Sequence, residues 1–184
     1  MMIGNGAKNQ FKDMRKIKSL VKKITKSCND NSVFLYFGDY PDDKKPDVGI
    51  LFKLLHEYNS KIKICMIQIS EAKSWGVPSF VHGVYWHNDY TKKCKWGGIH
   101  NGRPCSNTKK WVSLHKRIKN GIKKVFIFGG GLITLDEFKL IKQHKIQYEY
   151  FPVERKFEGD GKTRIPSNAT IQQKIGITWK ITSK

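Results

Sequence analysis

Short apolar runs that alternate with segments of helical periodicity constrain the fold of this 184-residue chain more than any other feature. Five segments have the length and composition of buried strands, namely Val33–Phe37, Ile62–Ile69, Phe80–Trp86, Lys124–Phe128 and Gln147–Phe151. Apolar residues recur at three- and four-residue spacing over 11–24, 47–58 and 134–144, as in amphipathic helices. Strands that alternate with helices indicate βαβ units. We therefore predict an α/β fold, a Rossmann-like three-layer sandwich with a mostly parallel five-stranded sheet.

The charge balance is strongly basic, because 35 Lys and Arg residues face 15 Asp and Glu residues, for a formal net charge of +20. Such an excess attracts polyanions, which include nucleic acids, acidic protein surfaces and phosphorylated ligands. Only five of the 35 basic residues are Arg, the better residue for bidentate recognition of phosphates and bases. The excess therefore favours general electrostatic attraction over specific readout, and the codon bias of an AT-rich genome gives the same composition.

The sequence has no apolar stretch near the roughly 20 residues that span a bilayer, and no apolar core of a signal peptide at its start. Its four cysteines, Cys28, Cys65, Cys94 and Cys105, form no CxxC pair, which is typical of a reducing compartment. We therefore expect no membrane span and a cytoplasmic, intracellular protein.

Two glycine turns follow the first and fourth predicted strands. Gly38-Asp39 ends one strand, and Gly129-Gly130-Gly131 ends the other. With the strand order 3-2-1-4-5, these strands are neighbours at the switch point where doubly wound sheets bind ligands. Glycines let backbone N–H groups approach an anion, and a helix capped by Thr134, with Glu137 completing a capping box, would direct its positive end to the same place. A ligand site is favoured over a turn without a ligand.

The stretch FGGGLITLDEF (residues 128–138) resembles the PGGxGTxxE signature of the LONELY GUY phosphoribohydrolases and the wider SLOG superfamily of Rossmann-like nucleotide-binding domains. The paired glycines correspond to Gly130 and Gly131, and the threonine and glutamate to Thr134 and Glu137. Upstream, SLHKR (residues 113–117) is similar to the MHxRK segment of those enzymes, so that His115 and Arg117 match its His and Arg.

The resemblance implies that Arg117 orients a ribose phosphate and that Glu137 supports cleavage of an N-glycosidic bond as catalytic residues. The implied ligand-binding residues are Gly38, Asp39, Gly129, Gly130, Gly131, Thr134 and His115. In the sensor branch of the superfamily, the same pocket would hold an adenine-nucleotide or ADP-ribose-type ligand without turnover. Ile133 stands where the enzymes have a glycine, which favours binding over catalysis.

A basic and aromatic insert lies before the fourth strand. Eleven Lys or Arg and no Asp or Glu lie between Thr91 and Lys124. Basic and aromatic side chains together bind single-stranded nucleic acid. The candidate nucleic-acid-binding residues are Lys92, Lys93, Lys95, Trp96, Arg103, Lys109, Lys110 and Trp111. The alternatives are a clamp for a small nucleotide and a solvated loop with its tryptophans on the sheet. The turn pairs Gly97-Gly98 and Asn101-Gly102 predict a β-ribbon or flap.

Zinc-ligand side chains also occur in this insert, at Cys94, His100 and Cys105, with His87 nearby. Their spacing is not that of a known zinc finger, so we predict no metal site and no cofactor.

Three regions follow from the pattern. Residues 1–30 contain a basic amphipathic helix after a frayed start at 1–8, residues 31–152 form the Rossmann-like nucleotide-binding domain with its insert at 87–120, and residues 153–184 form a C-terminal extension. Three functions stay open: SLOG-type binding of a nucleotide or nucleotide-derived ligand, phosphoribohydrolase activity on a nucleoside monophosphate, and a basic nucleic-acid-associated role in a ribonucleoprotein or viral particle. SLOG-like domains are often dimers, so the resemblance also implies a homodimer.

Overall fold

The computed structural model describes residues 1–4, 9–37, 46–69, 76–87, 99–100, 103–104, 121–130, 132–153 and 155–157. Predictions for the other residues lie outside the described part of the chain.

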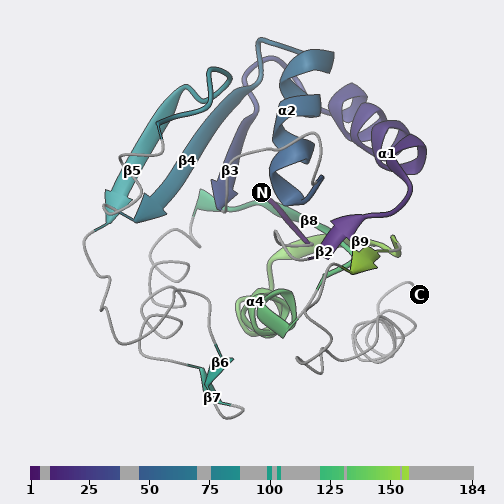
Figure 1. Cartoon of the computed structure of the whole chain (residues 1–184). Coiled ribbons are helices and arrows are strands. Elements are labelled where there is room, and N and C mark those ends of the chain that lie inside the picture. Colours follow the sequence, from purple (N-terminus) through teal and green to yellow (C-terminus); the bar gives the residue numbers. More distant parts are fainter. Residues whose placement is uncertain are drawn as a thin grey trace.

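Two parallel three-stranded sheets form the centre of the fold (Figure 1). One has the order β1-β8-β9, with β1 at Met2–Gly4, β8 at Lys124–Phe128 and β9 at Gln147–Phe151. The other has the order β3-β4-β5, with β3 at Val33–Phe37, β4 at Lys63–Ile69 and β5 at Gly83–His87. The predicted α/β class is confirmed. A single five-stranded sheet is not seen among the described residues, and the two sheets meet where β1 contacts β3.

Two short antiparallel pairs accompany these sheets. β2 (Asn9–Phe11) pairs with β10 (Arg155–Phe157), so part of the C-terminal extension returns to the start of the chain. β6 (Ile99–His100) pairs with β7 (Arg103–Pro104) inside the basic insert. The second pair confirms the ribbon that its turn residues predict.

The expectation of a frayed start is wrong for residues 1–4, while residues 5–8 lie outside the described residues. Met2 and Ile3 are 0% and 3% exposed, and β1 pairs in parallel with β8 from Met2 opposite Phe126 to Gly4 opposite Phe128. Three apolar residues are too few to show the periodicity of a strand. The sequence pattern therefore did not reveal that this segment lies at the centre of the fold.

In the part of the chain that the structure describes, three helices cover the sheets. α1 (Met14–Ser27) and α2 (Val48–Tyr58) lie on one side of β8 and β9, and α4 (Leu132–Gln143) lies on the other (Figure 1). Asp13 caps α1 by accepting from the Lys16 N–H, and Asp47 caps α2 by accepting from the Gly49 N–H. α1 therefore begins after Asp13, and the apolar Phe11 belongs to β2 instead of the predicted helix.

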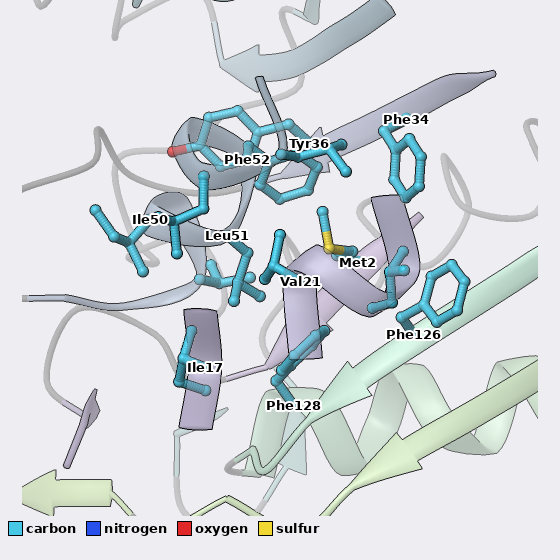
Figure 2. Packing of buried hydrophobic residues seen from close by; sticks show 14 of the residues in the cluster. Met2, Ile17, Val21, Phe34, Tyr36, Ile50, Leu51, Phe52, Phe126 and Phe128 are labelled. Carbon is cyan, nitrogen blue, oxygen red and sulfur yellow. The ribbon is translucent and has the colours of Figure 1, made fainter. Parts of the chain in front are cut away.

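The larger core joins both sheets to α1 and α2. In Figure 2, Met2 points into the centre of this cluster, between Val21 of α1 and Phe34 of β3. The ring of Phe34 stacks on Phe126 of β8 with centroids 6.2 Å apart, which links the two sheets directly. Because apolar burial is the main favourable term in folding, these contacts across β1 hold the sheets together.

A smaller core lies beneath the opposite face of β1, β8 and β9. It consists of Ile3, Val125, Ile127 and Tyr150 from the strands and Phe138 and Ile141 from α4. Successive strand residues point to opposite faces, so Met2 and Ile3 enter different cores. Burial on both faces explains why β8 reads as a continuous apolar run.

Candidate ligand site at the ends of β1 and β8

The chain leaves the carboxyl ends of the paired parallel strands β1 and β8 in two different directions. From β1 the chain proceeds through α1 to β3 on one side, and from β8 it proceeds through α4 to β9 on the other. The two helices lie on opposite sides of the strands, so the chain turns to opposite faces after β1 and after β8. The prediction that the strand at 33–37 is the direct neighbour of β8 is therefore wrong, because β1 takes that place.

Gly129 and Gly130 turn the chain sharply at the end of β8. Their φ angles are +59° and +121°, which side chains other than hydrogen rarely tolerate. A Cβ atom at Gly130 would lie 2.5 Å from Cγ2 and 2.6 Å from Cβ of Thr134. The Gly129 N–H donates to the Phe151 carbonyl over 3.0 Å, so this group continues the sheet.

Thr134 joins the end of β1 to α4. Its hydroxyl donates to the Gly4 carbonyl over 3.0 Å, and the residue is 2% exposed. Because α4 begins at Leu132, Thr134 lies inside its first turn. The predicted N-cap role of Thr134, and with it the capping box with Glu137, is therefore wrong. The glycine turn lets the helix start two residues earlier than its apolar periodicity indicates.

The amino end of α4 lies directly after this turn. The first N–H groups of a helix have no intrahelical acceptor and carry a partial positive charge, which favours an anion at this position. Glu137 follows Thr134 by three residues on α4 and is half-buried.

Basic side chains lie at the same edge of the sheets. The Lys16 ammonium donates to the Pro152 carbonyl over 2.8 Å, which places the start of α1 next to the end of β9. Lys12, Arg15 and Lys16 are exposed there, and a hollow of about 620 Å³ is lined by Lys12, Asp13, Met14, Arg15 and Lys16. The amino ends of α1 and α4 thus both contribute positive potential to this edge.

Most of the other predicted site residues lie outside the described residues. These are Gly38, Asp39, Gly131, His115 and Arg117 of the ligand site, and Lys92, Lys93, Lys95, Trp96, Lys109, Lys110 and Trp111 of the basic insert. The backbone of Arg103 is described in β7, while its side chain and that of Ile133 are not. Cys94 and Cys105, which were considered as zinc ligands, also lie outside the described residues.

Gly4 is the site residue that the sequence reasoning missed. A Cβ atom at this position would collide with the Phe128 carbonyl oxygen, so glycine allows the close approach of β1 and β8. The available signal was an apolar run, Met1–Ile3, followed by Gly4 and Gly6, which is the pattern of a strand with a glycine turn.

Comparison with protein-family models, with curated proteins and with solved structures finds no match to this chain. Within the part of the chain that the structure describes, no helix has the length and apolar character needed to cross a membrane.

Proposed function

We propose that this protein binds a nucleotide or nucleotide-derived ligand at the carboxyl ends of β1 and β8. The observation that carries the proposal is the junction of Gly4, Gly130 and Thr134, which joins the ends of two parallel strands to the amino end of α4. Glycine turns at a switch point, beside a helix start, form the usual setting for a phosphate in doubly wound folds.

The proposal treats the two sheets as one Rossmann-like layer with β1 between β3 and β8. The contact of β1 with β3 and the stacking of Phe34 on Phe126 support this arrangement. The proposal also retains the SLOG-type function that the motif at 128–138 suggests. In this proposal the first glycine turn is the one at Gly4, at the end of β1.

Arg15 and Lys16 supply cationic side chains at this edge. A nucleotide phosphate would interact with these positive side chains and with the amino end of α4. The phosphate is negative, and the partial positive charge of the helix end adds to the charge of the side chains. The base and sugar of the ligand are left to be identified by the binding experiment.

The test is a thermal-shift titration with AMP, ADP, ADP-ribose and cyclic AMP. A ligand that binds only the folded state raises the melting temperature by mass action. The double variant Arg15→Gln/Lys16→Gln should bind the active ligand at least about tenfold more weakly, as expected for lost charge-assisted contacts. The matched double variant Lys142→Gln/Lys145→Gln removes two exposed charges at the other end of α4 and should bind like the unsubstituted protein. The absence of any shift at millimolar ligand would refute the proposal.

Hydrolysis of a nucleoside monophosphate is the second candidate function, and the half-buried position of Glu137 close to Thr134 on α4 favours it. Incubation of the protein with a nucleoside 5′-monophosphate should then release the free base, and Glu137→Gln should abolish the release. Ligand binding without release of base would leave the binding function and exclude the hydrolase.

A further inference from the structure

The outer face of α1 is a continuous basic surface. Its apolar side is buried, with Ile17 and Val21 at 0% and Ile24 at 3% exposure. The remaining arc carries exposed basic residues over the whole length of the helix and its first flanking turn. These residues, called here the α1 basic face, are Lys12, Arg15, Lys16, Lys18, Lys22, Lys23 and Lys26.

Within the described ranges, no ion pair involves Arg15, Lys18, Lys22, Lys23 or Lys26, whereas Lys61 and Lys124 on other elements pair with Asp30 and Glu149. The only acidic residue in the helix segment is Asp13, whose carboxylate accepts from the Lys16 N–H as the cap. The α1 basic face therefore presents a net positive potential to solvent.

The arrangement also opposes the stability of the helix itself. Lys18, Lys22 and Lys26 follow one another at four-residue spacing, where like charges repel. The first turn contains no acidic residue, although its dipole favours negative charge there, and it contains Arg15 and Lys16 instead. Because Met14–Ser27 contains no acidic residue, every charged side chain on this helix is positive.

We propose that the α1 basic face binds the phosphate backbone of a nucleic acid without sequence specificity. Six of its seven cations are Lys, which contacts phosphate as a point charge and does not match base edges bidentately. An anionic membrane fits less well, because interfacial helices insert their apolar face into lipid. The apolar face of α1 is already buried against α2 and β1.

This function is separate from ligand binding at the strand ends, because Lys18, Lys22 and Lys26 extend from the middle to the carboxyl end of α1. The test is therefore the triple variant Lys18→Gln/Lys22→Gln/Lys26→Gln. Gln keeps a helix propensity near that of Lys, so the fold is retained and circular dichroism checks it. A matched triple variant, Lys63→Gln/Lys123→Gln/Lys145→Gln, removes the same charge from exposed sites on other elements.

Binding is measured by fluorescence anisotropy with labelled 20-nucleotide single-stranded RNA, single-stranded DNA and duplex DNA over a range of salt concentrations. The α1 variant should bind at least about tenfold more weakly near 0.1 M salt, and its log–log salt slope should fall by about 2, because each lost phosphate contact removes about 0.7 to 0.9. The matched variant should lose less than about threefold.

Equal weakening in the two variants would overturn the proposal, because bulk charge would then explain the binding. Failure of the unsubstituted protein to bind any of the oligonucleotides would overturn it as well. Vesicles of phosphatidylserine and phosphatidylcholine form the third arm, and vesicle binding through the same lysines without oligonucleotide binding would assign the surface to membranes instead.

Discussion

Gly130 shows how a single residue decides the path of the chain at the candidate site. Its φ of +121° and its close approach to Thr134 both exclude a side chain, so two independent constraints require glycine there. Gly121 differs, since no atom lies within 4 Å of a Cβ built on it and no positive φ is found there.

Gly130→Ala should therefore lower the free energy of unfolding by about 2 kcal/mol or more, from backbone strain together with overlap at Thr134. Gly121→Ala should change it by less than about 0.5 kcal/mol, because it meets neither constraint. Urea unfolding monitored by tryptophan fluorescence measures both. Equal effects of the two substitutions would contradict the assigned role of Gly130.

The buried phenol of Tyr150 makes the free energy of unfolding depend on pH. Burial raises the pKa of its phenol to about 12, above its ordinary value of 10.0. Between these values the unfolded state releases the proton while the folded state keeps it, so the free energy of unfolding falls as pH rises from about 10 to about 12. Below about pH 10 the phenol is protonated in both states and contributes no pH dependence.

Tyr150→Phe should remove this contribution, so its stability should fall less over pH 10 to 12 than that of the unsubstituted protein. Urea unfolding in steps of pH from 8 to 12 gives the comparison. Parallel pH profiles for the two proteins would show that other groups cause the alkaline loss.

At the scale of elements, local sequence signals predict the type of element better than its ends. β8 and β9 have the predicted bounds, because Gly129 follows the first strand and Pro152 follows the second. α4 starts two residues early and β5 starts three residues late, because Gly129 and Gly130 turn the chain at once and Phe80 packs into the core from a turn. The position at which an element begins or ends depends on tertiary contacts, which hydrophobic periodicity does not reveal.

Asp13 is a local signal that fixes where a helix begins, because it caps the amino end of α1. Asp13→Ala should lower the free energy of unfolding by about 1 kcal/mol, because the Lys16 N–H loses its acceptor. Asp13→Asn keeps an acceptor oxygen and should lose less than half as much. Thermal and urea unfolding measure the difference, and equal losses would show that the charge of Asp13, and not its hydrogen bond, stabilises α1.

At the scale of the whole molecule, β1 connects the parts of the fold. Met2 contributes to the larger core and Ile3 to the smaller one, while Gly4 meets α4 through Thr134. Residues 1–4 therefore form the edge of one sheet that meets the other sheet, and they contact helices from both halves of the chain.

Met2→Ala should lower the free energy of unfolding by about 2 to 5 kcal/mol, as for other fully buried large side chains. Val33→Ala is the control, because Val33 is 54% exposed and its truncation should cost less than about 1 kcal/mol. A Met2→Ala protein as stable as the control would mean that the start of the chain is not part of the core.

The sequence by itself determined the α/β class, the glycine turn at Gly129-Gly130 and the basic character of α1, because each depends on residues close together in the chain. Apolar runs, helical periods and Asp caps are local patterns with local physical causes. The motif at 128–138 likewise identified Gly129, Gly130 and Thr134 before their contacts were known.

Only the tertiary structure decided which strands are neighbours. The direct neighbour of β8 is β1 and not the strand at 33–37, and Thr134 links β1 to α4 instead of capping the helix. Met2–Gly4 is too short to be recognised by periodicity or propensity, and its place results from burial on both faces and from pairing with β8, more than a hundred positions away.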